Sequence, residues 1–461
     1  MSNFRAISTL AVASALGWTV PAHAQTAQQS DALRAEISAM REQMAAMAQQ
    51  IDRLEGRLVI ADTKAEAATQ AASQAGASAS QSAEKAAAAT KDVKVATLEK
   101  SNGWSFEPFG RLMIDAGSVD APDVINDPGL GFANEVRRAR IGVKGDIPGG
   151  FDYKIELEFA DNEVEITDAT LGYDAGAAKL TVGQHNNFQS LEELTSSRFT
   201  SFMERAAFTD AFGFQRRVGV SAEFNPGTLL VQGGVFTDNI DNLSASNNSW
   251  GADGRVVFAP KLANTQLHLG GSVHWRDFND GQSSVRYRQR PQVHFTDTRF
   301  VDTRSIAATG EFGYGLEFAA INGPFHATGE TYWQKASRTA GAADPTFFGG
   351  YAEVGYFLTG GDSRTYKGGK FDRIKPKNPV GNGGFGAVQV VARYDYLDLN
   401  DAGITGGMQN TYGLSLVWTP TDYTRFMLNY LHNEYDDAAI AAGLTRSYNV
   451  DTFGVRAQLD F

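Results

Sequence analysis

Basic side chains occupy alternate positions in one short stretch of the sequence, where they could guide anions. Arg138, Arg140 and Lys144 share one parity, whereas apolar residues such as Ile141 and Val143 occupy the other. Because successive side chains of a β-strand point to opposite faces, one face of this segment is predicted to be basic and the other apolar. Guanidinium and ammonium groups can replace part of the hydration shell of an anion. The pattern favours weak, reversible anion binding on a surface that faces water.

Further charged residues share this predicted orientation on later strands. Strand parity turns two additional arginines, Arg217 and Arg393, toward the same side as the basic face. Acidic residues such as Glu156, Glu158 and Asp168 share that orientation. The charges could therefore pair across the wall and hold water instead of guiding a solute, and for any single residue both interpretations remain open.

Two segments between strands carry a local excess of positive charge. Residues 281–304 hold five arginines, including Arg286 and Arg288, against two aspartates, and residues 363–378 hold six basic residues, including Arg373, against one aspartate. Residues 101–461 as a whole contain 31 basic and 43 acidic residues. Since the local field at its narrowest point sets the selectivity of a channel, these segments would concentrate anions if they fold inward. On an outer rim they would bind lipid phosphates and have no part in transport.

Enzymatic chemistry is not expected from the remaining candidate residues. His268 and His274 share strand parity, but no closely spaced set of metal ligands and no nucleophile motif accompanies them. We therefore expect no catalytic residue, no bound metal and no cofactor. No segment indicates binding to nucleic acid.

The elements that would position the basic residues are the strands of a closed barrel. Residues 151–159 read FDYKIELEF, an alternation of apolar and charged side chains that the last residues of the chain repeat up to Phe461. Short turns such as 147–150 alternate with long polar loops. From residue 104 onward the pattern predicts sixteen strands, which is typical of a transmembrane barrel with a water-filled lumen. Residues 360–383 are an exception, because they are too long for a periplasmic turn.

The N-terminus predicts export from the cytoplasm. Arg5 precedes an apolar stretch over residues 7–20 that closes with Ala22-His23-Ala24, so residues 1–24 are predicted to form a secretory signal peptide. No later segment has the 18 consecutive apolar residues of a membrane-spanning helix. The chain has no cysteine, which suits a large barrel whose strands are all paired. We expect the protein in the outer membrane of a Gram-negative cell.

Residues 25–103 differ in composition from the rest of the chain, because they contain no aromatic residue. Within 25–60, apolar residues are spaced alternately by four and three positions, which is the heptad repeat of a coiled coil and would lie in the periplasm. A single amphipathic helix on the barrel or the membrane is the alternative. Residues 61–103 are predicted to form an Ala/Ser-rich helical spacer. The predicted fold is thus all-β, a 16-stranded antiparallel transmembrane β-barrel over 104–461, preceded by an α-helical coiled-coil segment.

Several sequence motifs resemble one known family. The runs NEVRRARIGVKGDIPGGFDYKIELEF, ITDATLGYD, LTVGQ, SLEELTSSRFTSFMERA, RPQVHFTDTRFVDT, FDRIKP and ARYDYLDLND follow in this order. They are similar to the phosphate-selective porin O/P family over roughly residues 104–461. The resemblance implies a trimeric outer-membrane channel in which the third outer loop (185–214), the fifth outer loop (277–305) and the periplasmic segment 360–383 fold into the pore.

The resemblance also implies roles for individual residues. Arg138 and Arg140 match the arginine-rich strand of the family, and Arg198 and Arg205 lie in its constriction-loop motif. After Gln184 the family often has a lysine and a proline, whereas this chain reads HNNFQ over 185–189. This departure leaves less positive charge at the constriction loop.

Three functions follow from these patterns. The first is a passive porin that prefers small anions such as phosphate or another oxyanion, is embedded in outer-membrane lipid and, as the resemblance implies, assembles as a homotrimer. The second is a general or cation-preferring diffusion porin, because acidic residues are in the majority. The third is a structural role in which the coiled coil tethers the barrel to the periplasm.

Overall fold

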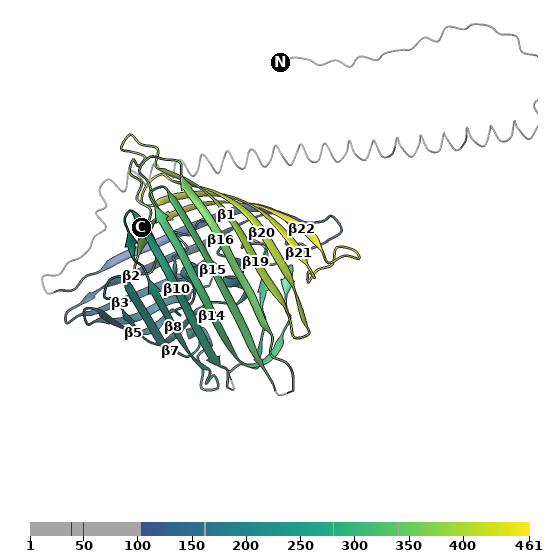
Figure 1. Ribbon diagram of the computed structural model, residues 1–461, viewed down its shortest axis with the longest axis horizontal. Helices are drawn as coiled ribbons and strands as arrows, with labels where there is room; N and C mark the ends of the chain where they lie inside the picture. Colours follow the sequence, from purple (N-terminus) through teal and green to yellow (C-terminus); the bar gives the residue numbers. More distant parts are fainter. Residues whose placement is uncertain (1–37, 39–48, 50–102, 161–162, 280, 340) are drawn as a thin grey trace, which may run out of the picture. The chain divides into compact units, whose positions relative to one another are not determined.

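The computed structural model describes residues 103–160, 163–279, 281–339 and 341–461, together with the single positions Ser38 and Gln49. The predicted signal peptide, coiled coil and spacer therefore lie outside the described residues, apart from those two positions and Gly103. The described chain forms a closed antiparallel barrel (Figure 1). Its sixteen wall strands are β1 (Glu107–Asp120), β2 (Gly131–Ile147), β3 (Phe151–Glu158), β4 (Glu165–Asp174), β5 (Ala178–Asn186), β6 (Arg216–Phe224), β7 (Leu229–Phe236), β8 (Trp250–Phe258), β10 (Thr265–Asp277), β14 (Ile306–Asn322), β15 (Phe325–Arg338), β16 (Thr346–Phe357), β19 (Ala387–Asp401), β20 (Ile404–Thr419), β21 (Thr424–Asp436) and β22 (Tyr448–Asp460).

Each wall strand pairs with the wall strands before and after it in the sequence. The barrel closes where β1 pairs antiparallel with β22, in a register that runs from Arg111 opposite Asp460 to Asp120 opposite Asp451. Closure leaves no strand edge unpaired, which is what a sheet needs in lipid. The predicted sixteen-stranded barrel is confirmed.

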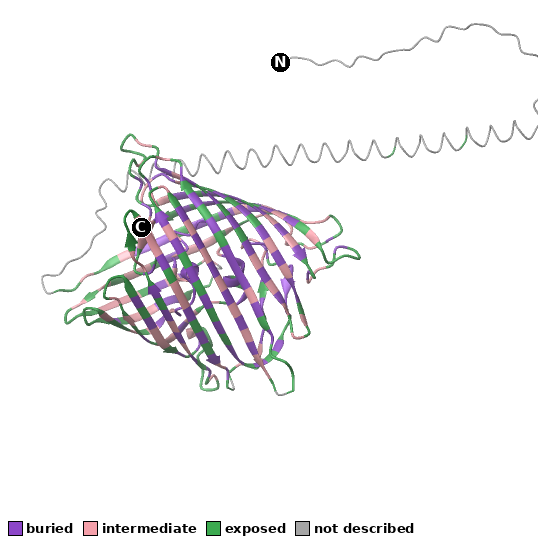
Figure 2. Ribbon diagram, in the orientation of Figure 1, coloured by how far each residue is buried: buried purple, intermediate pink, exposed green. Residues whose placement is uncertain are grey.

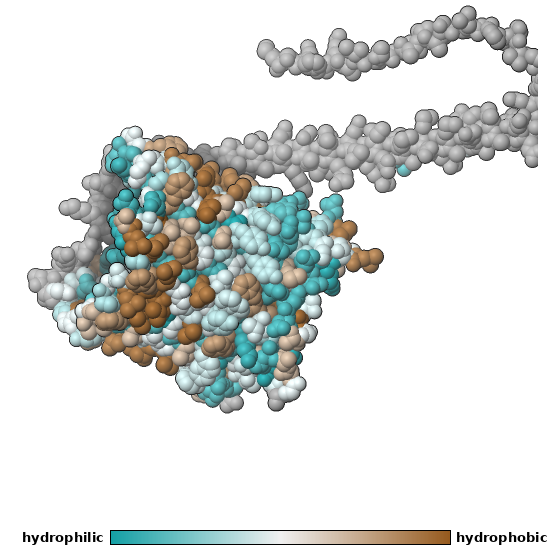
Figure 3. Space-filling model, in the orientation of Figure 1, coloured by the Kyte–Doolittle hydropathy of each residue, from teal (hydrophilic) through white to brown (hydrophobic). Residues whose placement is uncertain are grey.

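The alternation seen in the sequence becomes two faces of the wall. Buried and exposed residues alternate most clearly along the strands in the second half of the barrel, such as β14 and β20 (Figure 2). Many of the exposed side chains on the outer face of the wall are large and apolar. Examples are Ile141, Leu316 and Leu414, each about 60% exposed. Apolar residues gather on the visible outer wall of the barrel (Figure 3). This surface meets the hydrocarbon of a bilayer, because water would make so much exposed apolar area costly.

Aromatic residues form a belt on this outer surface near one end of the barrel. The rings of Trp250 and Trp275 lie 4.7 Å apart on β8 and β10, and those of Tyr314 and Trp333 lie 5.0 Å apart on β14 and β15. Phe348 on β16 continues the belt, 5.1 Å from Trp333. Such belts mark the level of the lipid headgroups in transmembrane barrels.

Three segments between wall strands are long. The first, residues 187–215, is here called the inner loop and holds α2 (Leu191–Leu194) and α3 (Ala207–Ala211). The second, 278–305, holds the short strands β11 (Ser284–Val285), β12 (Arg288–Gln289) and β13 (Val301–Asp302). The third, 358–386, is here called the hairpin segment and holds β17 (Thr365–Lys367) and β18 (Lys370–Asp372). Two smaller elements complete the fold, β9 (Lys261–Leu262) and the 3-10 helix η1 (Ile240–Asn242).

The inner loop leaves the wall between β5 and β6 and extends to the opposite side of the lumen. The backbone N–H of Met203 donates to Asn429 on β21 at 2.8 Å, and that of Ala207 donates to Asp395 on β19 at 2.9 Å. The hairpin segment lies against it, because the N–H of Phe371 donates to the hydroxyl of Thr195 at 3.3 Å. Among the described residues, no helix is long and apolar enough to cross a membrane.

Candidate functional site

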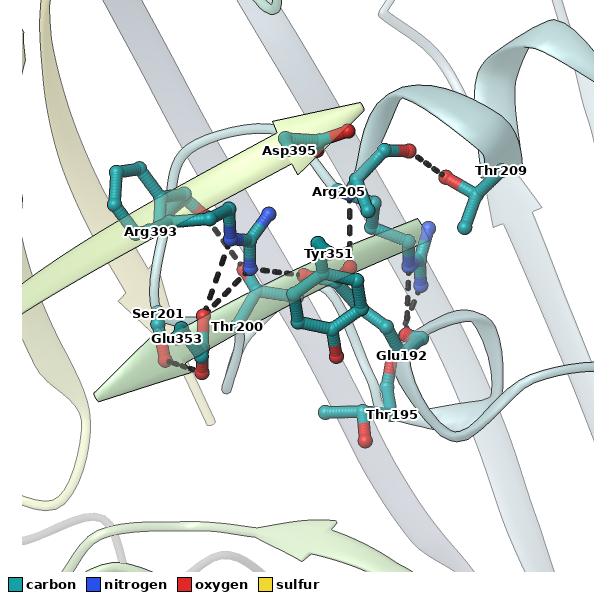
Figure 4. A network of polar contacts seen from close by, with 12 residues as sticks. Glu192, Thr195, Thr200, Ser201, Arg205, Thr209, Tyr351, Glu353, Arg393 and Asp395 are labelled. Carbon is teal, nitrogen blue, oxygen red and sulfur yellow. Dashed lines mark hydrogen bonds and ion pairs between the residues drawn. The ribbon is translucent and has the colours of Figure 1, made fainter. Parts of the chain in front are cut away.

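One arginine of the wall joins the inner loop to the barrel. Arg393 on β19 binds Glu192 of the inner loop at 2.5 Å and Glu353 on β16 at 2.7 Å (Figure 4). Its guanidinium is almost completely buried and lies 4.5 Å from the centroid of the Phe202 ring and 4.6 Å from that of Tyr351. Buried, doubly paired and covered by two rings, Arg393 holds the inner loop and is not open to a passing solute.

Wall carboxylates hold the inner loop at three further points. Asp395 accepts a hydrogen bond from the backbone N–H of Ala207. Glu353 accepts one from the hydroxyl of Ser201 at 2.8 Å (Figure 4). Glu330 on β15 binds the first residues of α2. These bonds satisfy backbone donors that would otherwise be buried without partners.

Arginines hold the other side of the same loop through its carbonyl groups. Arg364 of the hairpin segment donates to Phe199 O at 3.0 Å, and Arg425 on β21 donates to Arg198 O at 2.9 Å. Several basic residues therefore position the loop, and only some of the basic residues of the barrel remain available to a solute.

A β-bulge on β2 turns two consecutive arginines into the lumen. The register between β1 and β2 shifts between Arg138 and Val136, so Arg137 is an extra residue on β2. A bulge places two residues opposite one and reverses the parity of the strand. Arg137 and Arg138 both line an internal cavity, and Arg137 binds Glu204 of the inner loop in a two-pronged ion pair of 2.8 and 2.9 Å.

Two internal cavities meet at a group of four arginines. One cavity, of about 320 Å³, is bordered by residues of the outer loops such as Asn239 and Arg290 and is here called the outer cavity. The other, of about 600 Å³, is bordered by the hairpin segment and is here called the periplasmic cavity. Four residues line both and are here called the throat arginines: Arg138, Arg140, Arg205 and Arg216.

Three of the throat arginines have a close carboxylate partner. Arg140 binds Glu158 at 2.6 Å, Arg216 binds Asp168 at 3.0 Å, and Arg205 lies 3.3 Å from Glu193. Arg138 is 3.6 Å from Glu158, and the structure gives it no hydrogen bond to any described residue. The donors of Arg138 thus face both cavities and are available to an anion.

The two cavities differ in charge. Eleven basic and four acidic side chains line the periplasmic cavity, whereas six basic and five acidic side chains line the outer cavity. More basic than acidic side chains therefore line the periplasmic cavity, although the chain as a whole has a net charge of −12. Five of these basic residues are paired with carboxylates outside the lining, namely Arg140, Lys179, Arg198, Arg205 and Arg255.

The protonation state of Glu204 in the inner loop is set by its two arginine partners. Burial alone would raise the pKa of Glu204, but the guanidinium groups of Arg137 and Arg456 hold it well below its usual range. Glu204 is therefore a permanent anion that fixes the inner loop beside the throat.

The ten basic residues predicted from the sequence occupy several environments. Arg138, Arg140, Arg198 and Arg205 line the periplasmic cavity, and Arg373 lines a smaller cavity beside it, where it is paired with Asp460. Arg217 and Arg393 are buried in the wall. Lys144 is half-exposed and paired with Glu107. Arg286 and Arg288 lie in the loop 278–305 and border neither main cavity.

Three further basic residues border the periplasmic cavity but were not among the ten predicted site residues. They are Arg111 on β1, Lys154 on β3, which strand parity directs inward, and Arg216 at the start of β6. Strand parity could have found Arg111, which alternates with Leu112 and Ile114. Within the described residues, no cluster of three or more histidine or acidic side chains could hold a metal ion.

A closed sixteen-stranded barrel with an apolar exterior, an aromatic belt and a charged lumen defines a porin of the outer membrane. Residues 106–461 match the model of the family described as phosphate-selective porin O and P. The chain belongs to this family and is a channel rather than an enzyme.

Comparison with known proteins gives further similarities. The chain is 45% identical over 448 residues to an uncharacterized protein of Caulobacter vibrioides, with 92% of this chain and 90% of that protein covered. Its fold is similar to that of OmpT of Vibrio cholerae, with a TM-score of 0.52, 12% identity and coverage of 79% and 100% of the two chains. A trimer form of that OmpT matches with a TM-score of 0.50, 13% identity and coverage of 78% and 100%.

Proposed function

We propose that this porin is a passive channel that prefers anions, with phosphate or another small oxyanion as its solute. The charge of the periplasmic cavity carries the proposal, because eleven basic side chains face four acidic ones there. An anion that passes the throat would meet a positive field before it is released. The planar fork of arginine suits oxyanions, since it can donate two parallel hydrogen bonds.

Binding in such a channel is weak. Three of the four throat arginines share their charge with a carboxylate at 3.3 Å or less, so their attraction for a solute is reduced. Weak sites in series let an ion enter and leave, which fits diffusion rather than storage. We also propose that the protein is a homotrimer in outer-membrane lipid, with residues 25–60 as a periplasmic coiled coil. The trimer form of the structurally similar OmpT supports the first of these points.

A general or cation-preferring porin is the second candidate. The near balance of charge around the outer cavity, six basic against five acidic side chains, is the observation that favours it. The two functions differ in the sign of the selectivity and in the effect of removing charge at the throat.

The test compares the wild type with a variant that combines Arg138→Gln and Arg140→Gln. The zero-current potential of each reconstituted channel is measured in a KCl gradient. A unit charge a few ångström away is worth about 1 kcal/mol even in water-like surroundings, so the chloride-over-potassium permeability ratio should fall roughly threefold or more. Lys144→Gln is the matched control, because Lys144 borders neither cavity, and it should leave the ratio unchanged. An unaltered ratio in the double variant would reject the throat assignment.

A further inference from the structure

Glu330 on β15 has an unusual position for a carboxylate inside a channel. Its two oxygens accept the backbone N–H groups of Leu191 and Glu192, both at 2.8 Å, and the hydroxyl of Tyr351 at 3.0 Å. Glu330 is buried, with 3% of its surface exposed, and among the described residues it forms no ion pair. The charged groups near it are Glu317 on β14, Glu192 of the inner loop and Arg255 on β8, and Arg255 is itself paired with Glu317. This carboxylate is therefore used to hold backbone rather than to balance a cation.

A throat arginine, Arg205, binds the carbonyl groups of the same segment that Glu330 holds by its N–H groups. Arg205 donates from Nε to Glu192 O at 2.9 Å, and from Nη2 to Glu193 O at 3.1 Å and to Thr195 O at 2.9 Å. Figure 4 shows Arg205 directed toward Glu192. Carbonyl groups at the end of a helical turn lack partners within the turn, so a guanidinium satisfies them. Glu330 binds the N–H side of α2, and Arg205 binds its carbonyl side.

The backbone immediately before α2 is strained. Ser190, which precedes α2, has a φ of 64° and a ψ of 137°. A residue with a Cβ rarely adopts such a φ, and surrounding contacts must hold it there. The two hydrogen bonds from Leu191 and Glu192 to Glu330 begin at the next residue and supply that restraint.

We propose that Glu330 is a positioning residue for anion selectivity, which acts through α2 on Arg205. The proposal rests on the proposed anion preference of the throat. It predicts that neutralising Glu330 lowers the anion preference, which is opposite to the effect of removing a negative charge alone. If Glu330 were only a negative charge in the lumen, its neutralisation would raise the anion preference. If Glu330 positions Arg205, its neutralisation lowers the preference, because the guanidinium is no longer held at the junction of the cavities.

The test uses E330Q and the zero-current potential of the full-length channel in a KCl gradient. A glutamine keeps the shape of the side chain but presents an NH2 group to a backbone N–H, so at least one of the three bonds is lost. We expect the chloride-over-potassium permeability ratio to fall roughly twofold or more, the effect of one lost hydrogen bond. Thermal unfolding of the barrel in detergent is measured in parallel and should stay close to that of the wild type.

D395N is the matched control. Asp395 also lies on the wall and also binds the inner loop, through the N–H of Ala207. Its second oxygen has no hydrogen bond within 3.5 Å among the described residues, and the side chain of Gln292 lies near it. An asparagine can keep the bond with its oxygen and place its NH2 group at the free position. The ratio in D395N should therefore match or exceed that of the wild type. Y351F is a milder second variant, which removes one donor to Glu330 and should lower the ratio to a smaller extent.

A double-mutant cycle with R205Q separates the two proposals. If Glu330 acts through Arg205, E330Q should have no further effect in the R205Q background. An R205Q channel with an unaltered ratio would refute the throat assignment itself. A lowered ratio in R205Q, combined with an unchanged or raised ratio in E330Q or with effects that add, would overturn the role of Glu330 and leave the throat assignment standing.

Discussion

Basic residues in the lumen of this porin fall into two groups that differ in their contacts. Arg393 and Arg456 are buried and bind carboxylates of both the wall and the inner loop. Arg138 faces two cavities and lacks a hydrogen bond to any described residue. The first group fixes the shape of the channel, and the second presents charge to the solute.

Glu204 gives a test of this division by pH. Since its pKa lies well below the usual value of 4.5, its ion pairs with Arg137 and Arg456 contribute above that value and are lost only as the pH falls through the lower, folded-state pKa. In Glu204→Gln, the docking of the inner loop should lose roughly 1.5–3 kcal/mol, the range for hydrogen bonds to charged groups. Hydrogen exchange of the loop amides measures this loss.

The difference in docking free energy of the inner loop between Glu204→Gln and the wild type should remain constant from neutral pH down to about pH 5. It should shrink only in stronger acid. Asp344→Asn is the control, because Asp344 binds Lys335 and Arg338 outside the inner loop. A difference that disappears near neutral pH would contradict the lowered pKa of Glu204.

Strand parity predicts that Arg138 and Arg140 face the lumen, but it gives no role to Arg137. The bulge at Arg137 depends on how β1 and β2 pair, and a single strand read alone does not reveal an extra residue. The pairing of Arg137 with Glu204 joins residues 67 positions apart, which strand alternation does not encode.

At the level of elements, the inner loop rests on wall positions that have no side chain. A Cβ on Gly349 of β16 would lie 2.5 Å from the Cβ of Phe208 in α3, and one on Gly413 of β20 would lie 2.8 Å from the ring of Phe202. Glycine at these positions allows the loop to approach the wall closely. The glycines and the carboxylates of the wall together form a seat for the loop.

Gly349→Ala should displace this loop. Because the added methyl group overlaps Phe208, α3 has to move into the lumen, at a cost of roughly 1–3 kcal/mol for overpacking. We expect a lower single-channel conductance in planar bilayers. Gly254→Ala is the control, since its added Cβ would meet nothing closer than 3.5 Å and should leave the conductance unchanged. Equal conductance in wild type and Gly349→Ala would show that the loop is not seated on β16.

The elements that fold inward were predicted only through the resemblance to the porin family. Alternation located the wall strands on either side, and the excess length of 360–383 marked an exception. The contacts of the inner loop depend on residues from β15, β16, β19 and β21, which come together only when the barrel closes. Periodicity along one strand holds no information about them.

At the level of the whole molecule, overall charge and local charge have opposite signs. The chain has a net charge of −12, yet the periplasmic cavity is lined mainly by basic side chains. Strand number and closure followed from the sequence, because lipid requires an apolar face on every strand and a paired edge on every side. The sign of the charge that lines the lumen did not follow from the sequence. It depends on which charged residues are paired and which face the cavities.

The zero-current potential of single wild-type channels in a KCl gradient tests the central claim most directly. We expect an anion-signed potential and a chloride current that decreases when phosphate is added, because the throat arginines and the periplasmic cavity attract both ions. A cation-signed potential without block by phosphate would contradict the account. In that case the barrel would stand, and its acidic residues would determine the selectivity.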